Sequence, residues 1–196
     1  AIPTQRSKLY QQFIISWFQR EVSQKEKVGR VFAWSYSQCK NALTDLAYQI
    51  RRKGQSSISP KATENILLPY LGESTPQFVD WITTEKTLIE TAPSGYIRFT
   101  HESFEEFLCA EYLVDRNEDI DTDMLCFEQS AKPNIWAMPI ALAFEILDEP
   151  SLTFLNAAWI AEPLITAISS KNNEAFDIDE LSTDNWTALV LSALLG

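Results

Sequence analysis

The only histidine of the chain, His101, lies in the stretch "RFTHESFEEFLCAEYL", between a β-rich run and an acidic helix start. A helix N-terminus presents unpaired backbone N–H groups and the positive end of the helix dipole, so a histidine beside it can help to hold a phosphate. The residues alone favour a structural role, because Glu102, Glu105 and Glu106 already complement the dipole. Ser103 and Glu106 also have capping-box spacing. His101 is the one candidate binding residue.

Other catalytic and metal-binding patterns are missing from the sequence. It contains neither GxxxxGK[ST] nor GxGxxG, and "HESFE" has Glu105 where a zinc-binding HExxH motif needs its second histidine. Cys39, Cys109 and Cys126 form no CxxC pair, which favours free thiols in a reducing compartment over disulfides or a zinc site. We therefore expect no metal site, and we expect that the chain alone is not an enzyme.

The composition predicts a mainly helical globular protein. Hydrophobic residues make up 45% of the 196 residues, too many for a disordered chain, and only 5 residues are glycine. No apolar run approaches the roughly 20 residues of a membrane helix, and no signal peptide opens the chain. The first residue is not methionine and the last stretch, "ALVLSALLG", is apolar. We expect a cytoplasmic piece of a longer protein.

Charge is distributed unevenly along the chain, whose net charge is −11. Residues 1–53 hold 10 Lys and Arg against 3 Asp and Glu, and residues 54–196 hold 6 against 24. The acidic bulk argues against nucleic acid and anionic membranes as partners. The basic N-terminal part is expected to face the acidic part of the same chain or a neighbouring domain.

Four helices are expected before the β-rich run. Ser59 and Pro60 are suited to the N-cap and the first turn of the third helix, Gly72 to its end, and Pro69 is expected to shorten or kink it. Gly54 has the same terminating role after the second helix. The apolar periodicity places these helices over residues 4–27, 35–54, 56–72 and 74–86.

The periodicity then changes to that of a β-hairpin. Two short β-rich runs within residues 87–101 flank Pro93, Ser94 and Gly95, which predicts a loop of three to five residues. Three helices and a hairpin are the outline of a winged helix. A further helix is expected from near Ser103, with an apolar stripe of Phe104, Phe107, Leu108 and Tyr112.

The remainder of the chain is expected to form a helical bundle or the start of a helical array. A polar, acidic linker, "DRNEDIDTDM", suggests a domain boundary near residues 117–123. The fold class is therefore mainly α, a winged helix with a small β-hairpin followed by an α-helical bundle. Helices beyond the linker are expected over residues 135–147, 151–169 and 185–195.

The stretch "FTHESFEEFLCAEYL" resembles the winged-helix motif of NACHT-type NTPases, the signal-transducing ATPases that include NOD-like receptors and many bacterial relatives. The N-terminal "PTQRSKLYQQFIISWFQRE" and "LTDLAYQIRRKGQSSIS" are similar to two earlier segments of that family, in the same order. Glu105 replaces the usual glutamine of the motif and Cys109 replaces an alanine. The residues that match it are Phe99, His101, Phe104, Glu106, Phe107, Ala110, Tyr112 and Leu113.

The resemblance implies that His101 contacts the β-phosphate of ADP bound in an upstream nucleotide core, and so holds a closed state. Residues 1–28 would then be the tail of the helical domain after that core, 30–116 the winged helix, and 120–196 a helical domain leading to an absent sensor. ADP or ATP would bind only together with the upstream core, and this chain alone would hold no cofactor. The negative charge of Glu105 would weaken an anion contact at His101.

The resemblance also implies the partners, which are the upstream NACHT domain and the downstream sensor of the same protein. It further implies self-oligomerisation on activation and a role in bacterial defence or signalling.

Two other hypotheses for the function stay open. A winged-helix DNA-binding module has "RRK" at 51–53 in its favour, but the helix over 56–72 has only Lys61 as a basic residue. A helical scaffold would bind a protein partner through residues 120–196.

Overall fold

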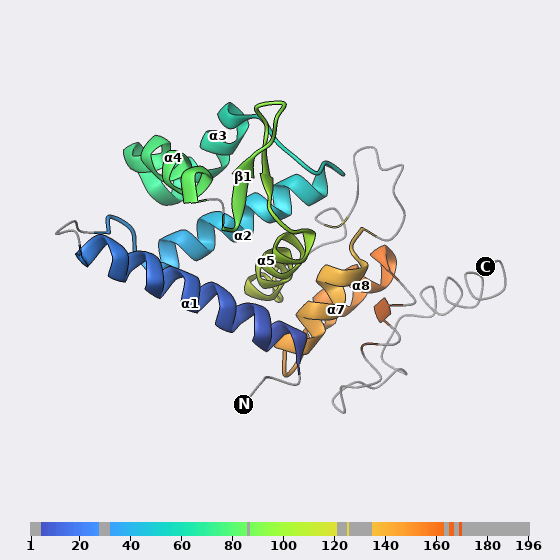
Figure 1. The fold of residues 1–196 in the computed structure, drawn as a ribbon. Helices are drawn as coiled ribbons and strands as arrows, with labels where there is room; N and C mark the ends of the chain where they lie inside the picture. The colour runs from blue at the N-terminus through green and yellow to red at the C-terminus, as the bar shows by residue number, and fades with distance from the viewer. Residues whose placement is uncertain are drawn as a thin grey trace.

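In the computed structural model the chain is mainly helical, with a two-stranded antiparallel hairpin (Figure 1). The structure describes residues 5–27, 32–85, 87–120, 125, 135–162, 165–166 and 169. The helices are α1 (Arg6–Lys27), α2 (Tyr36–Arg52), α3 (Pro60–Leu71), the 3-10 turn η1 (Gly72–Ser74), α4 (Thr75–Glu85), α5 (Glu102–Asp115), α7 (Ala137–Ile146) and α8 (Leu152–Ala161). The strands are β1 (Ile89–Thr91) and β2 (Ile97–Phe99). The helix expected over 185–195 lies outside the described residues.

The predicted signals at the ends of α3 are confirmed. Ser59 is the N-cap and its side chain accepts from the backbone N–H of Ala62, while Pro60 occupies the first position of the helix. Gly72 follows the last turn with a φ of 57°, a conformation that side chains disfavour. Of the two effects expected of Pro69, shortening is wrong, because α3 continues past it to Leu71, and a kink stays a prediction.

The hairpin loop between Thr91 and Ile97 has five residues, within the predicted range of three to five, and Gly95 has a φ of 80°. In its register Ile89 faces Phe99 and Glu90 faces Arg98. Outside the hairpin, Ile58 forms an isolated β-bridge with Ile97 through two 2.8 Å backbone hydrogen bonds. The segment just before α3 therefore lies along β2.

The predicted helix start near Ser103 is confirmed, but the predicted cap is not. The N-cap is His101, so the helix begins at Glu102, and Ser103 lies within the first turn rather than at its cap. The capping box expected from Ser103 and Glu106 is therefore wrong. Phe107, Leu108 and Tyr112 are buried as expected, and Phe104 is half-buried.

A cluster of aromatic side chains joins α1 to α4 and to the segment before α2. Trp17 stacks on Trp81 with ring centroids 5.5 Å apart, and Trp34 stacks on the other side of Trp81 at 5.6 Å. The Trp34 Nε1 donates to Ser74 Oγ over 2.8 Å. Trp17, Trp81, Trp136 and Trp159 are all buried, so these four tryptophans belong to the core.

The first helix, α1, buries only part of its apolar surface. Ile14 and Trp17 are buried, whereas Leu9 and Phe13 remain 48% and 42% exposed. Leu9 and Phe13 lie one turn apart on the same face of the helix, so this part of its apolar surface faces outward. The buried part of the helix packs against α5 and α7.

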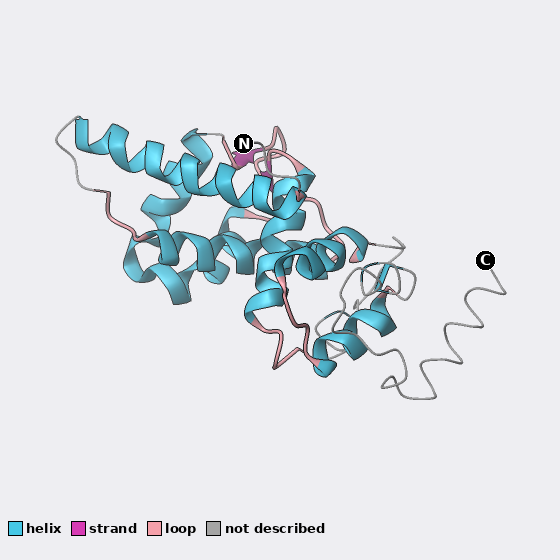
Figure 2. Cartoon of the chain, turned by 90° about the horizontal axis from the view of Figure 1, so that it is seen from below, coloured by secondary structure: helices cyan, strands magenta, loops and turns pink. Residues whose placement is uncertain are grey.

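Helix α5 lies between α2 and α7, and α8 follows beyond α7 (Figures 1 and 2). A single cluster of buried hydrophobic residues includes side chains from before and after the acidic linker, among them Leu108 and Phe154. The division into domains near 117–123 stays a prediction. The structure adds that the two parts pack on one another closely.

No described helix is long and apolar enough to cross a membrane. Cys39 and Cys109 are buried free thiols, while Cys126 lies outside the described residues. Burial raises the pKa of Cys39 to about 12 and raises that of Cys109 further, so both thiols are inert at neutral pH.

Candidate functional site

The candidate residue His101 lies on the surface where β2 leads into α5. Its backbone is extended, with φ −136° and ψ 135°, as an N-cap residue requires, but its side chain makes no capping hydrogen bond. The imidazole is exposed, and its ring approaches Phe104 edge-on with centroids 5.8 Å apart. The side chain is thus free of a structural hydrogen bond to the helix that it begins.

Aromatic side chains of α1 support the first turn of α5. Phe13 stacks on Phe104 at 4.8 Å, and Tyr10 meets the same ring edge-on at 6.3 Å. His101 rests at the outer end of this group of rings. The position of the imidazole therefore depends on how α1 and α5 pack, not only on the local turn.

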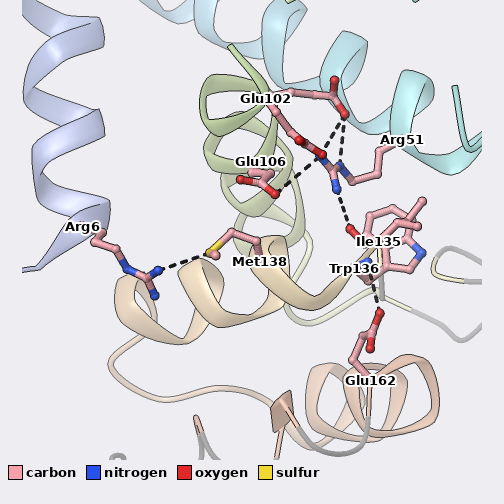
Figure 3. Close-up of polar contacts among 9 residues, drawn as sticks. Arg6, Arg51, Glu102, Glu106, Ile135, Trp136, Met138 and Glu162 are labelled. Atoms are coloured by element: carbon pink, nitrogen blue, oxygen red, sulfur yellow. Dashed lines mark hydrogen bonds and ion pairs between the residues drawn. The ribbon is translucent and has the colours of Figure 1, made fainter. Parts of the chain in front are cut away.

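The acidic first turn of α5 is held by one buried arginine, Arg51, at the end of α2 (Figure 3). The guanidinium Nε and Nη2 of Arg51 each lie 3.1 Å from the same Glu105 carboxylate oxygen. Glu102 and Glu106 approach Nη2 at 3.7 Å and 3.9 Å. The arginine side chain is 6% exposed and that of Glu105 is 9% exposed, so this is an interior ion pair.

This arrangement revises two expectations from the sequence. Arg51 does not form a surface cluster with Arg52 and Lys53, because its guanidinium points inward to Glu105. The charge of Glu105 is paired inside the fold instead of lying beside the His101 imidazole. Glu106, which the sequence suggested as part of a capping box, instead makes a longer contact to Arg51 at 3.9 Å.

Burial dominates the protonation of this carboxyl group. It raises the pKa of Glu105 to about 7, although the nearby Arg51 guanidinium opposes the shift. Burial also raises the pKa of Glu106, again against the opposing effect of Arg51. The first turn of α5 therefore carries less negative charge at neutral pH than its sequence suggests.

A second ion pair holds α5 against α2. Lys40 Nζ lies 3.0 Å from a Glu111 oxygen, and the two side chains are 24% and 8% exposed. Burial raises the pKa of Glu111, and the ammonium of Lys40 acts in the opposite direction. Tyr48 of α2 also stacks on Tyr112 of α5, with ring centroids 4.0 Å apart. The orientation of α5 on α2 is thus determined by both charge and ring packing.

The contacts of Arg51 and Glu162 with the start of α7 are among those that the sequence analysis missed. Arg51 also donates through Nη1 to the backbone carbonyl of Ile135, and a Glu162 oxygen accepts from the backbone N–H of Trp136 at 3.2 Å. A signal for Arg51 was present, because it follows Leu43 and Ala47 at i+8 and i+4 on the buried face of α2. The sequence holds no comparable signal for Glu162.

Within the described residues, no group of three or more histidine, cysteine or acidic side chains is placed to hold a metal ion. Comparison of the chain with protein-family models, with curated proteins and with solved structures finds no match. The chemistry of the site must therefore be argued from its own geometry. It consists of an exposed imidazole at a helix N-terminus whose acidic first turn is largely bound by a buried guanidinium.

Replacing Arg51 should test the importance of the buried ion pair. Arg51→Met leaves Glu105 buried without its cation, and we expect a loss of about 3 kcal/mol in the free energy of unfolding, measured with urea at pH 8. Lys53→Met, two positions along and exposed, should change it by less than about 0.5 kcal/mol. Equal effects of the two substitutions would contradict the assignment.

The raised pKa of Glu105 predicts a dependence of stability on pH. Between pH 4.5, the ordinary pKa of a glutamate, and about pH 7, the folded chain binds this proton more tightly than the unfolded chain does. The free energy of unfolding should therefore rise as pH falls from 7.5 to 5.5. In Glu105→Gln this rise should be smaller, whereas Glu118→Gln, at an exposed carboxylate, should keep it. An identical pH profile in Glu105→Gln and the unmodified chain would rule out this origin.

Proposed function

We propose that this chain is the regulatory region of a NACHT-type signal-transducing NTPase, with a winged helix that closes over ADP bound in an upstream nucleotide core. The main observation behind the proposal is the position of His101. It matches the histidine of the family motif, and its imidazole is exposed at the start of α5 without a capping hydrogen bond. A residue with a purely capping role would use its side chain there.

The order of elements supports a winged helix in residues 30–116. A winged helix runs helix, short strand, two helices and then a two-stranded wing, with the short strand paired to the second wing strand. Here α2 is followed by the bridging residue Ile58, then by α3, α4, β1 and β2. Ile58 pairs with Ile97 of β2, the pairing that this topology requires.

The electrostatics of the α5 start are compatible with an anion near His101. Of the three glutamates in the first turn, only Glu102 has a largely exposed side chain, at 78%. Glu105 is buried against Arg51, and burial favours its neutral form. A phosphate approaching His101 would therefore meet one outward carboxylate instead of three, together with the positive end of the helix dipole.

The proposed mechanism is a two-state hinge controlled by the nucleotide. With ADP in the core, His101 contacts the β-phosphate and holds the winged helix over the nucleotide. A signal from a sensor beyond residues 120–196, with exchange to ATP, shifts the population to an open state that self-oligomerises. Bacterial defence or signalling in the cytoplasm is the setting that the family resemblance implies.

A protein-binding scaffold is the second candidate, favoured by the exposure of Leu9 and Phe13 on α1. The DNA-binding hypothesis is weaker, because burial of Arg51 removes one cation from the "RRK" cluster. Neither α3 nor α4 supplies a basic surface in its place, since Lys61 is the only basic residue in the two helices.

His101→Ala in the whole protein should release ADP faster and raise basal oligomerisation. We expect about a tenfold increase in the ADP dissociation rate, the size of effect that loss of one hydrogen bond to a charged group produces. ADP retention after purification and a chase with unlabelled ADP measure this. Tyr96→Ala, at an exposed aromatic ring of the same hairpin, serves as the control. Unchanged ADP retention in His101→Ala would refute the proposed contact.

The same substitution should leave the stability of the isolated chain nearly unchanged. His101 is exposed and does not cap α5 with its side chain, so the free energy of unfolding should shift by less than about 0.5 kcal/mol. Urea unfolding of the 196-residue chain checks this. A loss above about 1 kcal/mol would instead indicate a structural role for the imidazole.

A further inference from the structure

One peptide group, between Ile135 and Trp136, is held at both ends by buried charged side chains (Figure 3). Arg51 donates to its carbonyl oxygen, which belongs to Ile135. Glu162 accepts from its N–H, which belongs to Trp136. The carbonyl and the N–H are the two poles of one planar amide, so the cation and the anion lie at complementary ends of its dipole.

These two contacts reinforce each other. A cation at the carbonyl oxygen draws electron density toward that end and makes the N–H a better donor to the carboxylate. Both side chains are buried, Arg51 at 5% and Glu162 at 7% exposed, so little solvent screening weakens the effect. The orientation of this peptide therefore depends on both charges together.

The clamped peptide stands at the start of α7. Trp136 is the N-cap of α7 and supplies no side-chain cap, so the helix receives its acceptor from Glu162, the residue that ends α8. Burial raises the pKa of Glu162, and the backbone N–H groups of Trp136 and Ala137 act against it by lowering that pKa. Seating α8 against α7 thus completes the N-terminus of α7 and fixes the carbonyl that Arg51 binds.

Arg51 links this peptide to the start of α5. The guanidinium that holds the Ile135 carbonyl through Nη1 holds Glu105 through Nε and Nη2. Glu105 lies one turn after His101, the N-cap of the same helix. One buried cation is therefore shared between the α5 start and the α7 start.

We propose that Arg51, the Ile135–Trp136 peptide and Glu162 form a latch that couples the seating of α7 and α8 to the order of the first turn of α5. Displacement of α8 removes the Glu162 carboxylate from the Trp136 N–H. The hydrogen bond from Arg51 to the Ile135 carbonyl then weakens, and so does the ion pair between Arg51 and Glu105. By linkage, loosening of the α5 start weakens the seating of α7 to the same extent. The role of the latch as a route from a sensor to His101 rests on the proposed function, whereas the coupling itself does not.

Hydrogen exchange in the 196-residue chain tests the coupling. Glu162→Met removes the acceptor at similar side-chain length, and we expect amide exchange in residues 105–109 of α5 to become about tenfold faster. Exchange in residues 64–68 of α3, which lie outside the latch, should stay within twofold of the unmodified chain. Glu162→Gln keeps an acceptor oxygen, so its effect on α5 should be smaller.

Glu145→Met is the matched control. Glu145 also lies in this part of the chain, on α7, and it binds Arg6 at 3.2 Å and the backbone N–H of Ser7 at 3.0 Å, both at the start of α1. Its loss should accelerate exchange in residues 9–12 of α1 and leave residues 105–109 unchanged. In the reciprocal direction, Arg51→Met should accelerate exchange in residues 140–143 of α7.

Two outcomes would overturn the latch. The first is that Glu162→Met accelerates exchange in α7 and α8 while residues 105–109 remain within twofold of the unmodified chain. The second is equal acceleration in α3 and α5, which would indicate global destabilisation instead of a local route. Because none of these measurements involves nucleotide, failure of the latch and failure of the ADP contact at His101 are separate results.

Discussion

The constraint on which the structure depends is the burial of a guanidinium. A charged side chain that is 6% exposed must have its donors satisfied, and Arg51 achieves this with Glu105 and the carbonyl of Ile135. Arg51 and these two partners come from three places that are distant in sequence: the end of α2, the start of α5 and the start of α7. Satisfying one cation therefore fixes the relative positions of three helices, and Glu162 extends the arrangement to the end of α8.

The position of His101 follows from the same constraint. Because Arg51 draws Glu105 inward, the first turn of α5 presents its aromatic residue, Phe104, to the rings of Tyr10 and Phe13 on α1. The imidazole then lies at the edge of this group, exposed and with no capping hydrogen bond. Phe104 therefore packs against α1, while the neighbouring His101 side chain stays exposed and available for the proposed phosphate contact.

Local signals in the sequence were sufficient for most element boundaries. Ser59, Pro60 and Gly72 bound α3 as predicted, and the hairpin loop has the expected length, since these residues act through their own backbone. Tertiary contacts, which local signals do not contain, determine the cap of α5 and the exposed face of α1. Ser103 has the spacing of a cap but lies inside α5, and Phe13 belongs to an apolar stripe but is partly exposed, because the neighbouring helices cover only one side of α1.

The inward direction of Arg51 has a consequence for the proposed switch. A buried ion pair is seldom the most stable solution, since well-packed apolar residues of similar volume often stabilise a fold as much or more. Burial raises the pKa of Glu105 against the opposing effect of Arg51, so desolvation outweighs attraction at that carboxyl group. An apolar core at this point would hold α2, α5 and α7 together but would not respond sharply to the loss of one partner. A buried cation shared by several partners does respond to the loss of one of them, because each loss leaves buried charge without compensation. The interaction that positions the helices is thus also the one best suited to transmit the loss of α8 to the turn that carries His101.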